Sequence, residues 1–169
     1  MNFLIITLRL LHILAGVFWV GAALINAFFL APTIAATGEA GTKFMAHLIG
    51  QARLSVRVTV ASYVTVLAGA ALYWIDSQGL TSPWQSSGPG IGFGLGALAA
   101  LVGFGTGQMV GKSLTTINQI VSKVQGAPTP DQVAALTRAR KRLATSSAIS
   151  TGSLIVALAF MATARYWVG

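Results

Sequence analysis

The stretch FLIITLRLLHILAGVFWVGAALINAFFLA, from Phe3 to Ala31, decides the fold class. It is apolar apart from Arg9, His12 and Asn26. About 20 apolar residues are enough for one helix to cross the hydrocarbon core of a bilayer. A helix is the expected form, because lipid offers the backbone no hydrogen-bond partners. The stretch therefore predicts a transmembrane helix near the start of the chain.

Three further stretches have the same character, which predicts one all-α integral membrane domain over residues 1–169. Of the 169 residues, 54% are hydrophobic and 8% are charged. A soluble domain carries about a quarter charged residues, so the composition argues against a soluble bundle. We expect an up-down four-helix bundle embedded in the lipid bilayer. Its spans are placed at about 3–31, 58–75, 91–111 and 143–166.

The charges predict the orientation of the bundle. Lys43, Arg53 and Arg57 lie between spans one and two, and the segment from Asp76 to Gly90 has no Lys or Arg. Six more cations lie between spans three and four. Because positive charge collects on the cytoplasmic side, we expect a bacterial inner-membrane protein with both termini outside. The six cations are Lys112, Lys123, Arg138, Arg140, Lys141 and Arg142.

The residue types present restrict the possible chemistry. The basic cluster from Arg138 to Arg142 has no aromatic residues among its cations, which indicates lipid headgroups rather than nucleic acid as its partner. The absence of cysteine excludes disulfides and thiol catalysis. The three carboxylates, Glu39, Asp76 and Asp131, are far apart in sequence and lie in or beside expected loops. We therefore expect a protein that is not an enzyme by itself.

The connections have helical signals of their own. Residues 42–57 predict a helix that lies against the bilayer or leads into span two. Apolar positions continue beyond span three until Gly126 and Pro128 interrupt the helix. Thr129 is a predicted N-cap, followed by Pro130 at the first helical position. Spans three and four are therefore expected to form a cytoplasmic helical extension of about 20 Å.

Small residues recur at intervals of about four along span three. This spacing lets helices approach closely in lipid. It favours packing inside the bundle, and a homodimer face is the alternative. The residues are Gly92, Gly96, Ala99, Gly103, Gly107 and Gly111.

Ionisable residues inside a span are costly and suggest a functional site. Arg9 and His12 share one face of span one, and Gly16 and Trp19 continue the same stripe. The rest of the span is mainly Leu, Ile, Val and Phe, so the stripe is expected to face the bundle interior. Gly16 is expected to leave open space beside the imidazole.

Span four supplies a matching pair, Met161 and Arg165, four residues apart. In an up-down bundle the start of span one and the end of span four lie at the same depth. His12 and Met161 would then both be axial ligands of a haem b, with Arg9 and Arg165 near its propionates. A five-coordinate haem, or one haem shared by two His12 residues across a dimer, is also possible.

Other interpretations of these residues stay open. His12 could be a helix-to-helix hydrogen-bond donor, Met161 could be packing filler, and the arginines could extend to the headgroups. Copper is the alternative metal for His12 and Met161, since imidazole and thioether suit Cu(I). His47 is expected at the inner interface, too far from His12 to share a ligand sphere.

The segment LHILAGVFWVG, from Leu11 to Gly21, resembles the first span of a broad group of bacterial membrane proteins. They include CopD-like copper-resistance proteins, related uncharacterised proteins, and HemJ-type protoporphyrinogen oxidases. The shared features are a Leu-His start, a Trp-x-Gly and a multi-span bundle. The resemblance implies that His12 is the first-span histidine, which in the HemJ-type group is linked to haem.

Together these observations predict a membrane protein that binds haem b near the outer side, for electron transfer or haem handling. The alternatives are a non-catalytic membrane subunit of a larger complex, and a copper-handling membrane protein.

Overall fold

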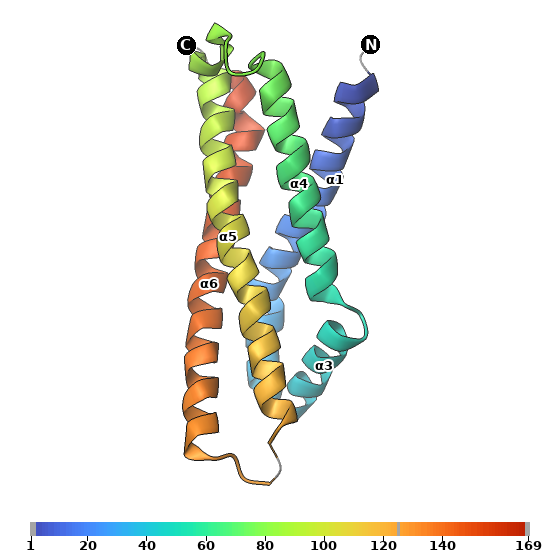
Figure 1. Cartoon of the computed structure of the whole chain (residues 1–169), viewed down its shortest axis with the longest axis vertical. Helices are drawn as coiled ribbons and strands as arrows, with labels where there is room; N and C mark the ends of the chain where they lie inside the picture. The colour runs from blue at the N-terminus through green and yellow to red at the C-terminus, as the bar shows by residue number, and fades with distance from the viewer. Residues whose placement is uncertain (1–2, 125, 168–169) are drawn as a thin grey trace.

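The computed structural model describes residues 3–124 and 126–167, and within these ranges the ordered elements are all helices (Figure 1). Among these described residues, four helical segments are long and apolar enough to cross a membrane. The chain is thus a multi-pass membrane protein with an all-α bundle. The elements are α1 (Phe3–Ile25), the π-helical turn η1 (Asn26–Leu30), α2 (Ala31–Thr37), α3 (Glu39–Gly50), α4 (Leu54–Asp76), the 3-10 turn η2 (Pro83–Ser86), α5 (Gly88–Ser122), α6 (Pro130–Thr163) and the 3-10 turn η3 (Ala164–Tyr166).

The first span continues past Ala31, where the sequence predicted its end. Pro32 has no N–H and its ring crowds the carbonyl four residues earlier, which normally stops or kinks a helix. Here the π-helical turn η1 precedes it, and the Ala31 N–H bonds to the Asn26 carbonyl, five residues back. The wider turn accommodates the proline, so the helical segment runs on to Thr37.

The helix predicted over residues 42–57 is present in two pieces. α3 ends at Gly50, and Arg53 adopts a left-handed backbone with φ 50° before α4 begins at Leu54. Arg57 therefore belongs to the first turn of α4. α2 and α3 form a short helical hairpin around Gly38, at the lower end of the view in Figure 1.

α5 and α6 form a long antiparallel hairpin. They contain 35 and 34 residues, or about 50 Å each, against about 30 Å for a bilayer core. Thr129 caps α6 as predicted, in a reciprocal capping box with Gln132, and Pro130 stands at the first position. The hairpin is therefore about 20 Å longer than a bilayer core requires, as expected.

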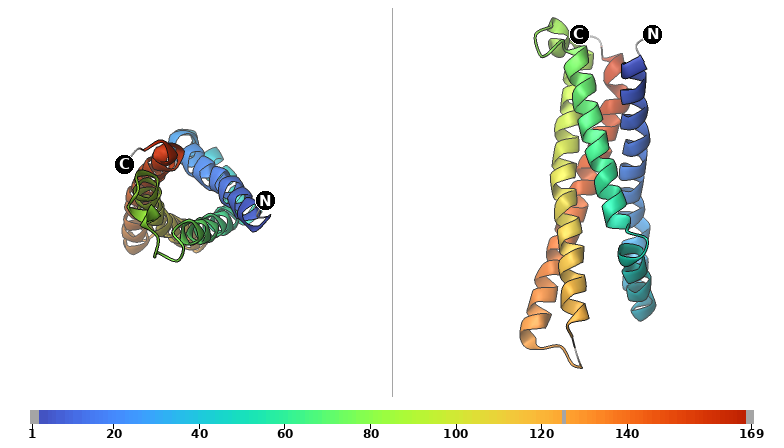
Figure 2. Two further views of the ribbon diagram at one scale, coloured as in Figure 1. Left: turned by 90° about the horizontal axis from the view of Figure 1, so that it is seen from above. Right: turned by 45° about the vertical axis from the view of Figure 1, so that its right-hand side comes forward.

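The four long helices follow one another around a ring in the order α1, α4, α5, α6 (Figure 2). Two pairs are packed tightly, α5 with α6 and α1 with α4, whereas contacts between the pairs are few. α1 is tilted: it approaches α6 near η1 and diverges from it toward the end that holds the start of α1, η2 and η3 (Figure 1). We call this the upper end, and the opposite one the lower end.

The glycines of α5 explain the close α5–α6 pairing. A Cβ on Gly92 would lie 2.7 Å from Ala164 Cβ, and a Cβ on Gly103 would lie 2.9 Å from Leu154. The Gly103 carbonyl also accepts a buried hydrogen bond of 2.9 Å from the Ser150 hydroxyl. Gly111 meets nothing within 4 Å. The upper part of the small-residue stripe thus packs inside the chain, which is the interpretation that the sequence favoured.

Candidate functional site

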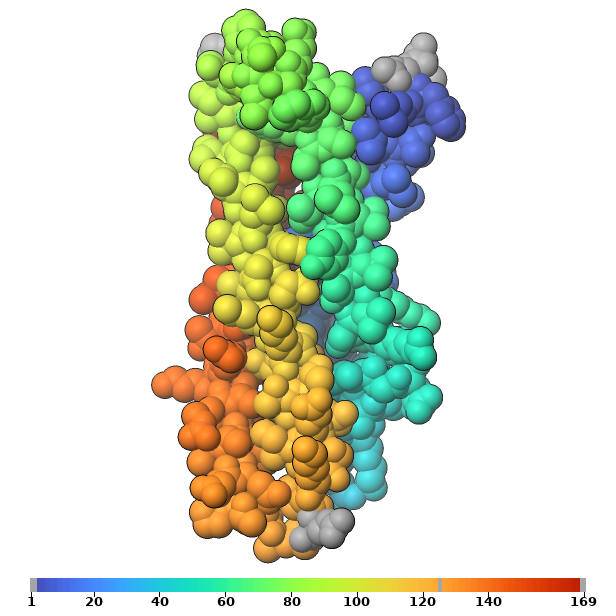
Figure 3. Space-filling model, viewed as in Figure 1, coloured from blue at the N-terminus to red at the C-terminus, as the bar shows by residue number. Residues whose placement is uncertain are grey.

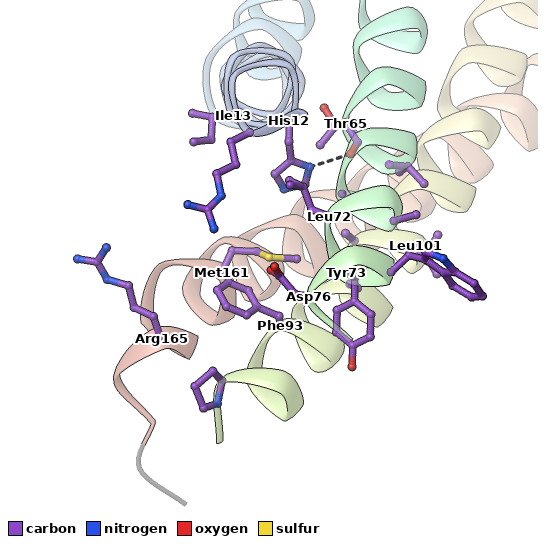
Figure 4. Close-up of a pocket in the computed structure, with 18 of the residues that line it drawn as sticks. His12, Ile13, Thr65, Leu72, Tyr73, Asp76, Phe93, Leu101, Met161 and Arg165 are labelled. Atoms are coloured by element: carbon purple, nitrogen blue, oxygen red, sulfur yellow. Dashed lines mark hydrogen bonds between the residues drawn. The ribbon is translucent and has the colours of Figure 1, made fainter. Parts of the chain in front are cut away.

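A cavity of about 970 Å³ lies between the two helix pairs in the upper half of the bundle (Figure 4). It lies where the two pairs have few contacts with each other. In Figure 3, atoms of α6 are visible between α4 and α5 in the upper half. The walls come from α1, α4, α5 and α6 and are mostly apolar. The predicted site residues among them are Arg9, His12, Trp19, Met161 and Arg165.

His12 is held by helix α4 on two sides. Its Nδ1 lies 2.8 Å from the main-chain carbonyl of Thr65, drawn as the dashed line in Figure 4. A carbonyl oxygen only accepts, so Nδ1 carries the proton and the Nε2 of a neutral ring keeps its lone pair. Gly69 lies against the ring: a Cβ there would be 2.6 Å from Cε1 and 3.7 Å from Nε2. The imidazole is thus oriented with its basic nitrogen available.

Met161 lines the cavity from α6, on the wall that faces α1 (Figure 4). Its methyl carbon would lie 3.2 Å from a Cβ built on Gly96, so the thioether side chain runs across that glycine. Imidazole and thioether therefore line one cavity from two helices. A histidine held through one ring nitrogen is the usual arrangement of a metal ligand, whose second partner is often a backbone carbonyl.

Gly16 does not have the position expected of it. A Cβ there would meet the Thr65 side chain at 3.4 Å, so Gly16 belongs to the α1–α4 contact and is not part of the cavity wall. The glycine beside the imidazole is Gly69. The sequence assigned the role to a neighbour of His12 on the same helix, whereas helix pairing places a glycine of α4 there.

Trp19 is buried in the core of the bundle, and little of its side chain is exposed to the cavity. It is 4% exposed and packs in a cluster with Ala61 and Leu154. Its ring meets Phe104 edge-on, with centroids 6.3 Å apart. Trp19 therefore joins α1 to the other helices at the cavity wall and supports the site mainly by packing.

Two arginines line the cavity from different helical elements. Arg9 comes from α1 and Arg165 from η3, and both are exposed. The Arg165 guanidinium donates a hydrogen bond to the Tyr166 hydroxyl and lies over that ring, 4.7 Å from its centroid. Figure 4 shows Arg165 at the edge of the group of lining side chains. The lining of this largely apolar cavity therefore includes two cationic side chains.

Several lining residues were not among the predicted ones. Asp76 ends α4 and brings a carboxylate to the cavity, although the sequence suggested an isolated loop acid. The same depth reasoning that paired Arg9 with Arg165 applies to Asp76, because span two ends at the upper end. Trp84 of η2 lines the cavity between Tyr73 and Phe93, with ring centroids 5.4 and 6.4 Å away.

The metal donors near the cavity are few. Among the described residues no three His, Cys, Asp or Glu side chains gather into a metal-binding group. His47 is exposed in the last turn of α3 and is not part of the cavity wall. The histidine and methionine of the cavity therefore offer at most two ligands of the kind that transition metals prefer.

No protein-family model, curated protein or solved structure matches this chain. The fold and the site together define it as a multi-pass helical membrane protein with a cavity between two helix pairs, α1 with α4 and α5 with α6.

Proposed function

We propose that the upper cavity binds one haem b, with His12 as an axial ligand, and that the protein transfers electrons or handles haem. The observation that carries this proposal is the Nδ1 bond of His12 to Thr65, which leaves Nε2 as a donor in a cavity of about 970 Å³. Cofactor pockets measure about 300–1,000 Å³ and are mostly apolar. Bound haem would supply a one-electron Fe(III)/Fe(II) couple.

The donor set fits a haem better than a copper ion. A porphyrin supplies four nitrogens of its own, so one or two protein ligands are sufficient. Copper bound by protein alone needs more donors or a two-coordinate Cu(I) site, for which His12 and Met161 are the candidates. Because the described residues hold no larger donor cluster, haem is the first choice and copper the second.

The two cationic lining residues fit the two acidic propionates of a haem, whereas the third charged lining residue, Asp76, is itself an acid. Arg9 and Arg165 are exposed, and a guanidinium binds a carboxylate through two parallel hydrogen bonds. The aromatic side chains of Tyr73, Trp84 and Phe93 would cover the apolar part of the ring. We infer from the charge distribution that the upper end faces outward across a bacterial inner membrane.

The test is an absorption spectrum of detergent-purified protein from haem-supplied cells, before and after dithionite. We expect a Soret band with sharp reduced α and β bands, and we expect His12→Ala to lose them. His47→Ala is the matched control, because His47 is exposed and lies outside the cavity. It is expected to keep the full spectrum.

A featureless spectrum from folded, haem-supplied protein would contradict the haem proposal. Metal analysis of the same sample then distinguishes the alternatives. Copper that is retained by the wild type and lost in His12→Ala supports copper handling. A folded protein without bound metal supports a non-catalytic membrane subunit. Size-exclusion elution of each variant verifies that the bundle still assembles.

A further inference from the structure

A second cavity, of about 450 Å³, lies between α5 and α6 toward the lower end, away from the upper cavity. Its walls combine three cations with two hydroxyl residues, and the remaining residues are apolar. The lining residues are Lys112, Ser113, Thr116, Ile120, Ala135, Arg138, Ala139 and Arg142. We call this the basic cavity.

Ser113 is the unusual member of the basic cavity. It is 2% exposed, and within the described residues its hydroxyl has no hydrogen-bond partner. Thr115 and Thr116 next to it bond back to the carbonyls of Gly111 and Lys112. A buried hydroxyl without a partner is destabilising, so such a group suggests that a ligand completes it.

The charge around Ser113 is not balanced by the protein. Lys112 comes from α5, and Arg138 and Arg142 come from α6. None of the three carboxylates of the chain lines the basic cavity. Among the described residues the ion pair present is Lys43–Glu39, on α3. Lys112, Arg138 and Arg142 are exposed side chains that line the same cavity as the buried Ser113 hydroxyl, so an anion bound there would meet three cations that no carboxylate neutralises.

The basic cavity lies at the depth of lipid headgroups. Lys112 follows the uncharged stretch 91–110, and Arg142 precedes the uncharged stretch 143–164. These two side chains therefore mark the level at which the apolar spans end. Arg138 lies one helical turn beyond Arg142, toward the water.

We propose that the basic cavity binds a phosphate group, and that its depth selects the headgroup phosphate of an anionic phospholipid. The guanidinium groups of Arg138 and Arg142 offer paired N–H donors, and Lys112 adds a point charge. The Ser113 hydroxyl would donate to a phosphate oxygen. This site is independent of the haem proposal, because the two cavities share no residues.

The test measures thermal stabilisation and native-mass-spectrometry retention in detergent-purified protein titrated with short-chain phosphatidylglycerol, phosphatidylcholine or inorganic phosphate. We expect phosphatidylglycerol to bind, with phosphatidylcholine much weaker. The double variant Arg138→Gln/Arg142→Gln is expected to lower the affinity about tenfold or more, since two charge-assisted hydrogen-bond groups are lost. The matched control is Arg140→Gln/Lys141→Gln, which removes the same charge from the same helix outside the cavity.

Each outcome decides one point. Equal losses in the two double variants would overturn the proposal, because they indicate diffuse charge attraction. Absence of binding by every probe would overturn it as well. Binding of inorganic phosphate that depends on Arg138 and Arg142, without a further gain from phosphatidylglycerol, would assign the site to a free phosphate.

The stability of Ser113→Ala, measured with and without ligand, distinguishes a serine that binds a ligand from one that only stabilises the fold. Without ligand the variant is expected to be as stable as the wild type or more stable, because it removes an unpaired buried hydroxyl. With phosphatidylglycerol it is expected to gain less stabilisation than the wild type. A variant that loses stability without ligand would show that the hydroxyl serves the fold.

Discussion

The imidazole of His12 on α1 donates its Nδ1 proton to the main-chain carbonyl of Thr65 on α4, across 2.8 Å. This bond joins the two helices at the cavity and fixes the ring in one tautomer. Hydrogen bonds between helices in lipid contribute about 1 kcal/mol, so its structural value is modest. Its chemical consequence is larger, since it leaves Nε2 as the basic nitrogen of the neutral ring.

Gly69→Ala tests whether the ring position matters. The added Cβ would lie 2.6 Å from Cε1 and 2.8 Å from Nδ1 of His12, so the ring must move and its bond to Thr65 is weakened. Changes in the groups that orient a metal ligand lower metal affinity about 10- to 100-fold. We expect a comparable loss of haem affinity, measured by titrating apo-protein with haem.

Gly21→Ala is the control, because nothing lies within 4 Å of a Cβ at that position of α1. It is expected to bind haem as the wild type does. If Gly69→Ala also retained full affinity and an unchanged spectrum, the orientation of His12 by α4 would have no role in binding.

The depth of the candidate site residues was predictable, and their lateral neighbours were not. In an up-down bundle, counting residues from the membrane surface gives the level of each side chain. This is why His12 and Met161, 149 positions apart in sequence, line one cavity. Counting does not give helix order or rotation, so the contacts of His12 with Thr65 and Gly69 were missed.

Two local backbone features were also not predicted from the sequence. Proline usually ends or kinks a helix, so the sequence predicted that the first span stops before Pro32. In the structure the π-helical turn η1 accommodates Pro32, and α1 continues into α2. Arg53 interrupts the predicted helix 42–57 because its backbone is left-handed. The sequence gives no sign of this break, since the residue is an arginine and not the glycine that such a conformation usually requires. The capping box at Thr129 was predictable because capping is set by adjacent residues alone.

Met161→Leu asks whether the thioether is a ligand. The substitution nearly conserves volume, so the fold should tolerate it. A methionine ligand raises the potential of a haem, and its loss opens a coordination position. We expect a lower midpoint potential and carbon monoxide binding by the reduced variant. Met109→Leu, at an exposed site outside the cavity, is expected to change neither. An unchanged potential in Met161→Leu would assign Met161 to packing.

The orientation can be tested directly, because the chain has no cysteine of its own. Ser86→Cys places a thiol in the exposed upper loop, and Ala127→Cys places one in the turn between α5 and α6. We expect an impermeant maleimide to label the first in intact spheroplasts and the second only after lysis. The opposite pattern would reverse the orientation and move the upper cavity to the cytoplasmic side.

Gly92→Ala tests the packing that holds the upper end together. The new Cβ would lie 2.7 Å from Ala164 Cβ and 3.0 Å from its Cα, and Ala164 is fully buried, so η3 must shift. Overpacking of this kind costs about 1–3 kcal/mol. We expect a lower unfolding temperature in detergent and, because Arg165 follows Ala164, weaker haem binding.

Gly105→Ala, on the same helix with nothing within 4 Å, is expected to be neutral or slightly stabilising, since alanine favours helix over glycine. Equal effects of the two substitutions would mean that α5 tolerates side chains on either face and that close packing does not hold η3.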